Sequence, residues 1–306
     1  MYNSNNEFFM SPKNDYVFKK IFGDENNKDI LSSFLSCVIN EQINDVSILN
    51  NEITKENTAD KKSILDIRAT INDGVQIDIE IQLSRTIYMP ARSLYYWSKI
   101  YMEQLQIGQI YKKLNRTICI NILDFISTES KKYHSVYRLK ETEENFELTN
   151  LMEIHFIEIP KLKGYEKNDM LSQWINFINA DSREELKKMA IVNKNIDKAF
   201  DILNVMSQSK EERAAYLSRE MALHDEVTKL EEALQEGRQE GRQEGRQEGR
   251  QEGRQEGLEE GRQEGLEEGE KKKALEIAKN LLDILDNETI AIKTGLTLDE
   301  IENLRK

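Results

Sequence analysis

The sequence predicts an α/β domain with a helical C-terminal half, followed by a low-complexity repeat and a small helical tail. Three observations support this prediction: helical and strand-like spacings alternate up to residue 125, helical spacing fills residues 169–226, and a four-residue repeat covers residues 236–269. With 306 residues, the chain is long enough for one large domain or two modest ones. We expect a folded domain at 1–228, a repeat at 229–269 and a tail at 270–306.

The first half of the chain predicts the order helix, three strands, helix, strand. The segment Val75–Leu83 shows the clearest pattern, because apolar residues alternate with polar ones, among them Asp78, Glu80 and Gln82, as on the two faces of a strand. Residues 117–125 are almost continuously apolar, which is typical of a central strand buried on both faces. The expected helices cover residues 15–22, 28–40 and about 91–107, and the expected strands cover residues 43–50, 63–71, 75–83, 117–125, 133–140 and 152–159.

The composition restricts the possible classes of protein. The net charge is −13, whereas a protein that coats DNA is normally basic, because phosphate neutralisation supplies most of its affinity. An acidic chain is still compatible with an enzyme that meets DNA over a small patch through a bound cation. The N-terminal residues lack the pattern of a signal peptide and no apolar run approaches ~18 residues, so we expect a cytoplasmic protein without a membrane span.

Two acidic residues on neighbouring strands form a candidate metal site. Asp66 precedes the turn at residues 71–74 and Glu80 follows it, so an antiparallel hairpin can bring both side chains to one end of a sheet. Two close carboxylates repel each other unless a cation bridges them, and Mg²⁺ or Mn²⁺ suits such oxygen ligands. The alternative is the solvated polar face of an edge strand, which has the same alternating pattern. The pattern alone leaves both interpretations open.

Four stretches of the chain resemble the PD-(D/E)XK nuclease superfamily and, within it, the Rpn family of recombination-promoting nucleases related to transposases. They follow one another in the family's order at 14–35, 64–82, 92–111 and 114–125. The family-like region covers about residues 8–225, most of the chain outside the repeat. The resemblance implies a restriction-endonuclease-like αβββαβ core with added strands. It also implies a metal-dependent endonuclease that hydrolyses phosphodiester bonds in DNA.

The resemblance assigns roles to three residues of the hairpin. Asp66 matches the metal-binding aspartate of the second core strand, and Glu80 matches the glutamate of the E-x-K element, which implies that both hold Mg²⁺, or Mn²⁺ or Ca²⁺. Gln82 stands where the superfamily usually has lysine. Glutamine cannot carry positive charge or act as a general acid, but it can orient the attacking water by hydrogen bonding.

Two further residues are candidates for the catalytic centre. Arg68 lies two residues after Asp66, and therefore faces the same side of its strand, where it can contact phosphate. Its alternative role is a cross-strand partner of Asp78 or Glu80. Asp15 matches a region where many relatives place a helical acidic residue near the metal; alternatively, its carboxylate only stabilises the start of the helix through the dipole.

Four residues are candidates for contacts with DNA. Lys19 lies one helical turn after Asp15, and Arg92, Tyr96 and Lys99 lie along the long helix at about 91–107. Arginine, lysine and tyrosine side chains commonly contact a DNA backbone. The alternatives are a solvated lysine and aromatic residues that belong to the core or to a helix–helix contact.

The repeat at residues 236–269 has conflicting helical properties. Its period places Glu four residues from Glu and Arg four residues from Arg, and such like-charge neighbours destabilise a helix. Its nine glycines each cost about 1 kcal/mol relative to alanine, so the isolated segment should be a weak helix. Two hypotheses stay open: the repeat pairs between chains through its Glu and Arg stripes, or it is a flexible spacer. The acidic tail favours a role in homo-oligomerisation over DNA recognition.

Three functional hypotheses follow from the sequence. The first is a DNA endonuclease of the transposase-related or recombination-promoting type. The second is a catalytically inactive DNA-binding module on the same fold, because the usual lysine is replaced by Gln82. The third is a protein-interaction scaffold in which the repeat and the tail carry the function.

Overall fold

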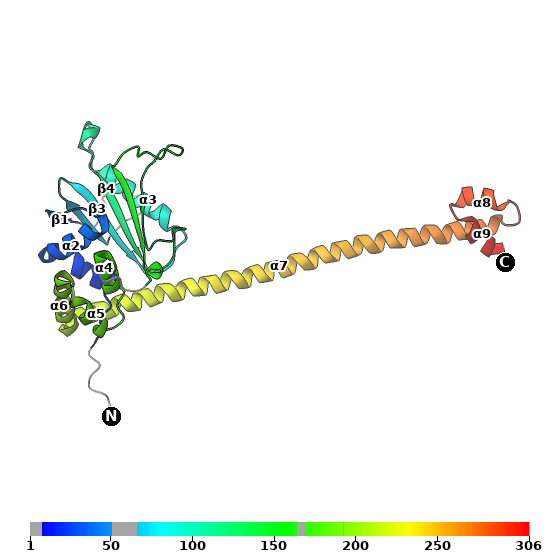
Figure 1. Ribbon diagram of the computed structural model, residues 1–306. Helices are drawn as coiled ribbons and strands as arrows, with labels where there is room; N and C mark the ends of the chain where they lie inside the picture. The colour runs from blue at the N-terminus through cyan, green and yellow to red at the C-terminus, as the bar shows by residue number, and fades with distance from the viewer. Residues whose placement is uncertain (1–7, 51–65, 164–168, 192, 306) are drawn as a thin grey trace, which may run out of the picture. The chain divides into compact units, whose positions relative to one another are not determined.

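The computed structural model describes residues 8–50, 66–163, 169–191 and 193–305, and its chain forms two compact units, Met1–Val227 and Thr228–Lys306. The first unit combines a six-stranded sheet with surrounding helices, which confirms the predicted α/β class (Figure 1). Residues 63–65, the expected beginning of the second strand, lie outside the described residues.

The helices and strands of the first unit follow one another in the order that the apolar spacing of the sequence predicts. The main elements are α1 (Asp15–Phe22), α2 (Lys28–Ile39), β1 (Val46–Leu49), β2 (Ile67–Ile71), β3 (Val75–Gln82), α3 (Met89–Glu103), β4 (Thr117–Leu123), β5 (His134–Tyr137), β6 (Met152–Glu158), α4 (Met170–Ile178), α5 (Arg183–Ala190), α6 (Lys194–Gln208) and α7 (Lys210–Leu281). Short 3-10 turns lie at η1 (Glu25–Asn27), η2 (Tyr111–Lys113) and η3 (Ile159–Lys161).

The strands are ordered β1-β2-β3-β4-β6-β5 across the sheet. β2 and β3 form an antiparallel hairpin whose turn contains two residues with positive φ, Asn72 at 43° and Gly74 at 93°. A side chain at Gly74 would be strained by this φ and would also meet the Asn115 amide at 2.8 Å. Helix α3 then carries the chain back to the end of the sheet at which β3 begins, so that β4 pairs with β3 in parallel.

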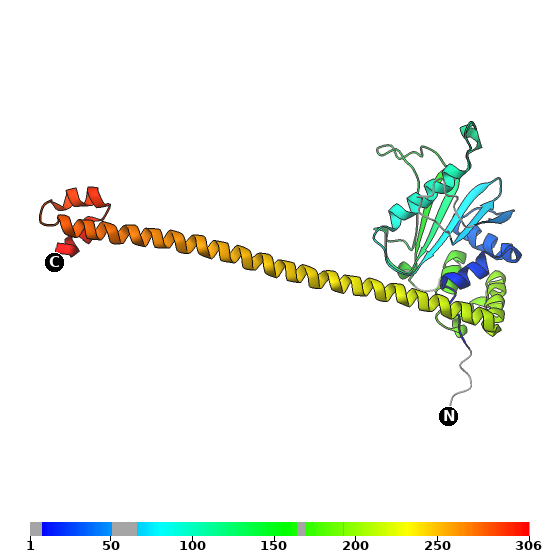
Figure 2. The same cartoon turned by 180° about the vertical axis from the view of Figure 1, so that it is seen from behind.

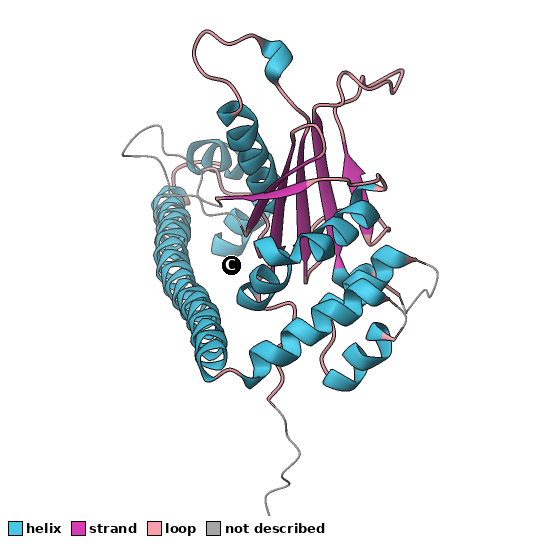
Figure 3. Cartoon of the chain, turned by 90° about the vertical axis from the view of Figure 1, so that its left-hand side faces the viewer, coloured by secondary structure: helices cyan, strands magenta, loops and turns pink. Residues whose placement is uncertain are grey.

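Helices cover both faces of the sheet (Figure 3). The apolar residues of β3, such as Ile77 and Ile79, pack on one face with α1, α2, α4 and α6, around the fully buried Phe22 and Trp174. Helix α3 covers the other face, where its Ile100 belongs to a second apolar cluster with β4 and β6 (Figure 2). The polar face of β3 therefore points toward α3, inside the domain.

The second unit contains the rest of α7 and two short helices. The whole repeat at residues 236–269 is helical, and each of its residues is exposed. Glu, Arg, Gln and Leu are good helix formers, and together they fill three of every four positions, which offsets part of the glycine cost. The tail helices α8 (Asn287–Thr294) and α9 (Leu298–Arg305) form a small core with the end of α7, and Gly295 ends α8 with a φ of 75°.

In the part of the chain that the structure describes, no helix has both the length and the apolar character needed to cross a membrane.

Candidate active site

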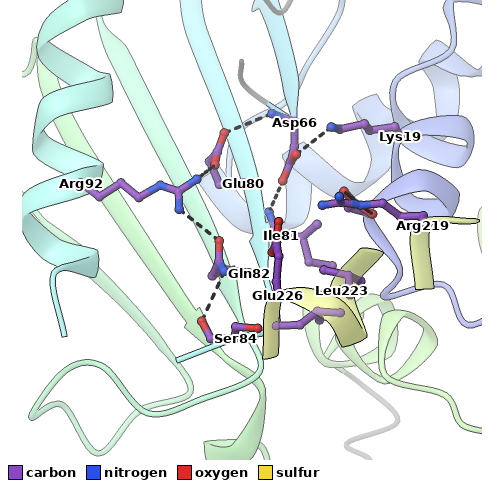
Figure 4. Close-up of a pocket in the computed structure, with 12 residues that line it drawn as sticks. Lys19, Asp66, Glu80, Ile81, Gln82, Ser84, Arg92, Arg219, Leu223 and Glu226 are labelled. Atoms are coloured by element: carbon purple, nitrogen blue, oxygen red, sulfur yellow. Dashed lines mark hydrogen bonds and ion pairs between the residues drawn. The ribbon is translucent and has the colours of Figure 1, made fainter. Parts of the chain in front are cut away.

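A cavity of about 420 Å³ lies at the C-terminal end of β3 (Figure 4). Three parts of the first unit form its walls: α1, the β2–β3 hairpin with the start of α3, and the first turns of α7. The lining residues are Asp15, Lys19, Asp66, Glu80, Ile81, Gln82, Leu83, Ser84, Arg92, Arg219, Leu223 and Glu226.

Backbone hydrogen bonds bring Asp66 and Glu80 to the same end of the hairpin. The Asp66 amide donates to Glu80 Oε1 at 3.1 Å, and the Ile81 amide donates to Asp66 Oδ2 at 2.9 Å. Asp66 lies directly before β2, so the antiparallel register of the hairpin places it beside the end of β3. The two carboxyl groups therefore share one wall of the cavity.

The acidic face of β3 is buried, because β3 is a central strand covered by α3. Asp78 and Glu80 are only 1% and 3% exposed, which contradicts the alternative that they belong to the solvated face of an edge strand. Burial raises the pKa of Asp78 to about 7, against a hydrogen bond from Cys119 that lowers it. Burial, followed by the charges of Asp78 and Asp66, raises the pKa of Glu80 well above its usual range. Both carboxyl groups therefore hold a proton more readily than usual, and a nearby positive charge would favour their ionised forms.

Three cations face the carboxylates from different elements. Lys19 Nζ of α1 lies 2.9 Å from Asp66 Oδ1. Arg92 of α3 donates from Nη2 to Glu80 Oε2 and from Nη1 to Gln82 Oε1, both at 3.2 Å. Figure 4 shows Arg92 on one side of the hairpin and Lys19 and Arg219 on the other.

The third cation, Arg219, holds Asp15. Its Nε lies 2.8 Å and 2.7 Å from the two carboxylate oxygens of Asp15. Asp15 is the first residue of α1, after the N-cap Asn14. Helix α7 is also tied to α1 next to this pair, because Lys20 Nζ lies 3.1 Å from a carboxylate oxygen of Glu212.

The structure brings together six of the nine candidate residues: Asp15, Lys19, Asp66, Glu80, Gln82 and Arg92 all line the cavity. Arg68, Tyr96 and Lys99 do not line it. Arg68 is opposite Asp78 in the hairpin, but its Nη1 pairs with Glu103 Oε2 of α3 at 2.7 Å. The guanidinium is thus held by the far end of α3 and not by a position beside Asp66. Tyr96 and Lys99 lie further along α3, where Lys99 Nζ is 5.8 Å from the ring centre of Tyr95.

Sequence reasoning missed the contribution of α7. Arg219, Leu223 and Glu226 form one wall of the cavity, although more than a hundred residues separate them from Arg92. The sequence around them shows only helical spacing, and no motif distinguishes Arg219 from the other charged residues of this helix. Only the packing of α7 against α1 in the folded domain determines which residues of α7 face the cavity.

The residues present fit a hard divalent cation. The described residues contain no group of three or more His, Cys, Asp or Glu side chains arranged to hold a metal ion. Mg²⁺, however, is commonly held by one or two protein carboxylates and takes its other ligands from water and substrate phosphates. Asp66 and Glu80 offer such a pair, and the buried Oδ1 of Asp78 has no hydrogen-bond partner in the described part of the chain. A bound cation would favour the ionised form of these buried carboxyl groups.

Comparison with known proteins adds one match. A family model described as PD-(D/E)XK nuclease family transposase matches residues 12–233, which is more than half of the chain. No curated protein and no solved structure matches the chain.

Proposed function

Because the chain belongs to the PD-(D/E)XK nuclease family of transposases, we propose that it is a divalent-metal-dependent endonuclease that hydrolyses phosphodiester bonds in DNA. A single observation carries this proposal: Asp66 and Glu80 meet at the end of one hairpin, in a cavity with three cationic side chains. Carboxylates can hold the ion of metal-assisted phosphodiester hydrolysis, and cationic side chains can stabilise the charge that develops on the phosphate.

In this proposal, Asp66 and Glu80 hold the metal, which is Mg²⁺ or, alternatively, Mn²⁺ or Ca²⁺. When bound, such an ion would polarise the scissile phosphate and lower the pKa of a coordinated water. Asp15 is a weaker candidate for a third ligand, because Arg219 holds both of its carboxylate oxygens. Lys19 would have to turn from Asp66 toward the phosphate when the ion enters, whereas Arg92 would keep its bond to Gln82 and release only Glu80.

We infer that Lys19 supplies the positive charge that Gln82 cannot. Its ammonium lies 2.9 Å from Asp66 and lines the cavity, whereas the guanidinium of Arg68 is paired with Glu103 outside the cavity. The Gln82 amide is held at both ends, since its oxygen accepts from Arg92 and its nitrogen donates to the Ser84 carbonyl at 3.3 Å. A side chain fixed in this way suits the positioning of a water molecule.

A nicking assay tests the proposal. Purified full-length protein is incubated with supercoiled plasmid in EDTA, Mg²⁺ or Mn²⁺, together with Asp66→Asn and a matched control, Asp73→Asn, in the exposed hairpin turn. We expect metal-dependent nicking that falls at least ~100-fold in Asp66→Asn, the scale expected when a group that stabilises transition-state charge is lost. Asp73→Asn should nick like the wild type.

Two results of this assay would reject an active nuclease. Equal nicking by Asp66→Asn and the wild type would assign the activity to a contaminant. DNA binding without nicking in any of the metals would favour the second candidate, an inactive DNA-binding module. The neutral Gln82 in the usual lysine position is the specific observation in favour of that candidate.

We further propose that residues 1–228 are the nuclease domain on an αβββαβ core, and that residues 229–269 and 270–306 support homo-oligomerisation. The proposal rests on the exposed Glu and Arg stripes of the helical repeat, which would complement each other if two chains paired, and on the separate apolar core of the tail. Light scattering after size exclusion should show an oligomer for the full chain and a monomer after truncation at residue 228. A full chain that is monomeric would reject this assembly.

A further inference from the structure

One segment of this acidic chain is locally basic. Residues 85–113 contain five Lys or Arg residues and a single acid, Glu103, although the whole chain has a net charge of −13. Arg92 of this segment lines the cavity. Arg85, Lys112 and Lys113 are exposed, and none of the three has an ion-pair partner among the described residues. These three cations are thus available to an external anion.

Cationic and aromatic residues share one face of α3. Tyr88, Arg92, Tyr95 and Lys99 follow one another at intervals of four, three and four residues, which places them along one stripe of the helix. Tyr88 is 70% and Tyr95 41% exposed. The stripe meets the cavity at Arg92 and leads away from it toward the other end of the sheet.

A projecting loop continues this stripe beyond α3. Residues 105–114, here called the arm, follow α3 and extend past the end of the sheet (Figure 2). Gln104 fixes the base of the arm, because its oxygen accepts from the Asn115 amide at 2.7 Å and its Nε2 donates to Thr117 Oγ1 at 2.8 Å. The tip is exposed, with Tyr111 at 83%. The arm is therefore anchored at its base and presents Tyr111 and two lysines to solvent.

We infer that the α3 stripe and the arm form a surface that contacts the backbone of double-stranded DNA on one side of the cleavage point. The inference rests on the proposed function, because the cavity marks where the scissile bond would lie. Charge complementarity favours DNA over a protein, since the exposed Arg85, Lys112 and Lys113 have no ion-pair partners among the described residues of an otherwise acidic chain. The exposed Ile107 and Ile110 of the arm suit apolar contact with sugars and base edges in a minor groove.

The length of α3 gives the extent of this contact. Its 15 residues span roughly 22 Å at 1.5 Å per residue, which corresponds to ~6 base pairs of duplex at 3.4 Å each. The arm adds further length beyond the helix. A duplex that ends fewer than ~6 base pairs from the cleavage point would therefore not reach Lys112 and Lys113.

The salt dependence of DNA binding tests the inference without any cleavage. Binding of a 30-base-pair duplex to the full-length chain is measured in EDTA by fluorescence anisotropy over a range of salt concentrations. The test variant is Lys112→Gln/Lys113→Gln, and the matched control is Lys131→Gln/Lys132→Gln, an exposed lysine pair before β5. Each lost phosphate contact lowers the slope of log K against log salt by about 0.9, so the test variant should lose up to ~1.8. The same change weakens binding roughly 10- to 100-fold near 0.1 M salt.

The outcomes separate this inference from the proposed function. An unchanged slope and affinity in the test variant, or an equal loss in the control, overturns the inference, even if Asp66-dependent nicking stands. A reduced slope in a protein that never nicks DNA supports the surface and rejects the nuclease. If instead the test variant changes oligomeric state in light scattering and binds DNA like the wild type, the surface is a contact between copies. Circular dichroism should show that both double variants are folded, because all four lysines are exposed.

Discussion

Acid titration of His134 gives the most quantitative prediction of this structure. His134 Nε2 lies 2.8 Å from His155 Nδ1, and His155 Nε2 lies 2.6 Å from Glu153 Oε1. Arg116 and Arg138 donate to the other oxygen of Glu153, each at 2.8 Å. Glu153 Oε1 accepts a hydrogen bond from His155 Nε2, and a single proton fits between His134 Nε2 and His155 Nδ1. A second proton on this pair of facing nitrogens would have no acceptor between the two rings.

Burial, together with the neighbouring His155, lowers the pKa of His134 from 6.5 to about 4. Because folding lowers this pKa, the unfolded chain binds a proton between pH 6.5 and pH 4 that the folded chain does not bind. The resulting stability is present above pH 6.5 and is lost as the pH falls toward 4. The full difference corresponds to about 3 kcal/mol, and solvent screening of the half-buried ring reduces it to about 1–3 kcal/mol.

The substitution His134→Gln removes this titration. We expect the free-energy advantage of the wild type over the variant to shrink by about 1–3 kcal/mol between pH 7 and pH 4.5. Urea unfolding followed by circular dichroism at several pH values measures this difference, and the exposed His224→Gln serves as the control. Although burial opposes it, hydrogen bonds from His155 and Arg138 lower the pKa of Glu153 to about 2, so Glu153 titrates below this range. Equal pH dependence of the wild type and His134→Gln would refute the reasoning.

Three further perturbations have defined outcomes. Lys19→Met should lower the nicking rate at least ~100-fold with unchanged thermal unfolding, because the ammonium beside Asp66 is lost. Lys19→Arg should restore part of the rate, and full activity of Lys19→Met would exclude this role of Lys19. Arg219→Gln should release the Asp15 carboxylate from its fixed position in the cavity wall and, because this misplaces a charged group of the site, lower the nicking rate ~10-fold or more. The rates of the wild type and the variant are compared at saturating Mg²⁺. Trp174→Ala should lower the free energy of unfolding in urea by about 3–5 kcal/mol, because this fully buried ring packs against several aromatic side chains. The control Ile191→Ala changes a side chain that is 86% exposed, and its free energy of unfolding should stay within about 0.5 kcal/mol of the wild type.

The local patterns of the sequence were sufficient to predict the hairpin at the centre of the site. A strand was expected at Val75–Leu83, and β3 covers Val75–Gln82, because alternation with a period of two is a local property of the chain. The turn at Asn72 and Gly74 is equally local, and it fixes the antiparallel register that brings Asp66 next to Glu80. The resemblance to a nuclease family rested on the same short segments, and the family match confirms it.

Burial of the acidic face could not be predicted from the strand itself. The alternating pattern of β3 is the same for an edge strand in water and for a central strand beneath a helix. Only the packing of α3 and β4 on the hairpin leaves Asp78 and Glu80 almost without solvent. That burial raises the pKa of both groups, so that a nearby cation would favour their ionised forms.

The sequence by itself determined the strands, the turn and the two neighbouring carboxylates, because periodicity and turn chemistry act over a few residues. Only the tertiary structure decided which cations face them. Arg68 is close to Asp66 in the sequence but pairs with Glu103, whereas Arg219 is far away in the sequence and lines the cavity. Long side chains pair with whichever charges the packing of distant helices places within about 4 Å, and this packing depends on the whole domain.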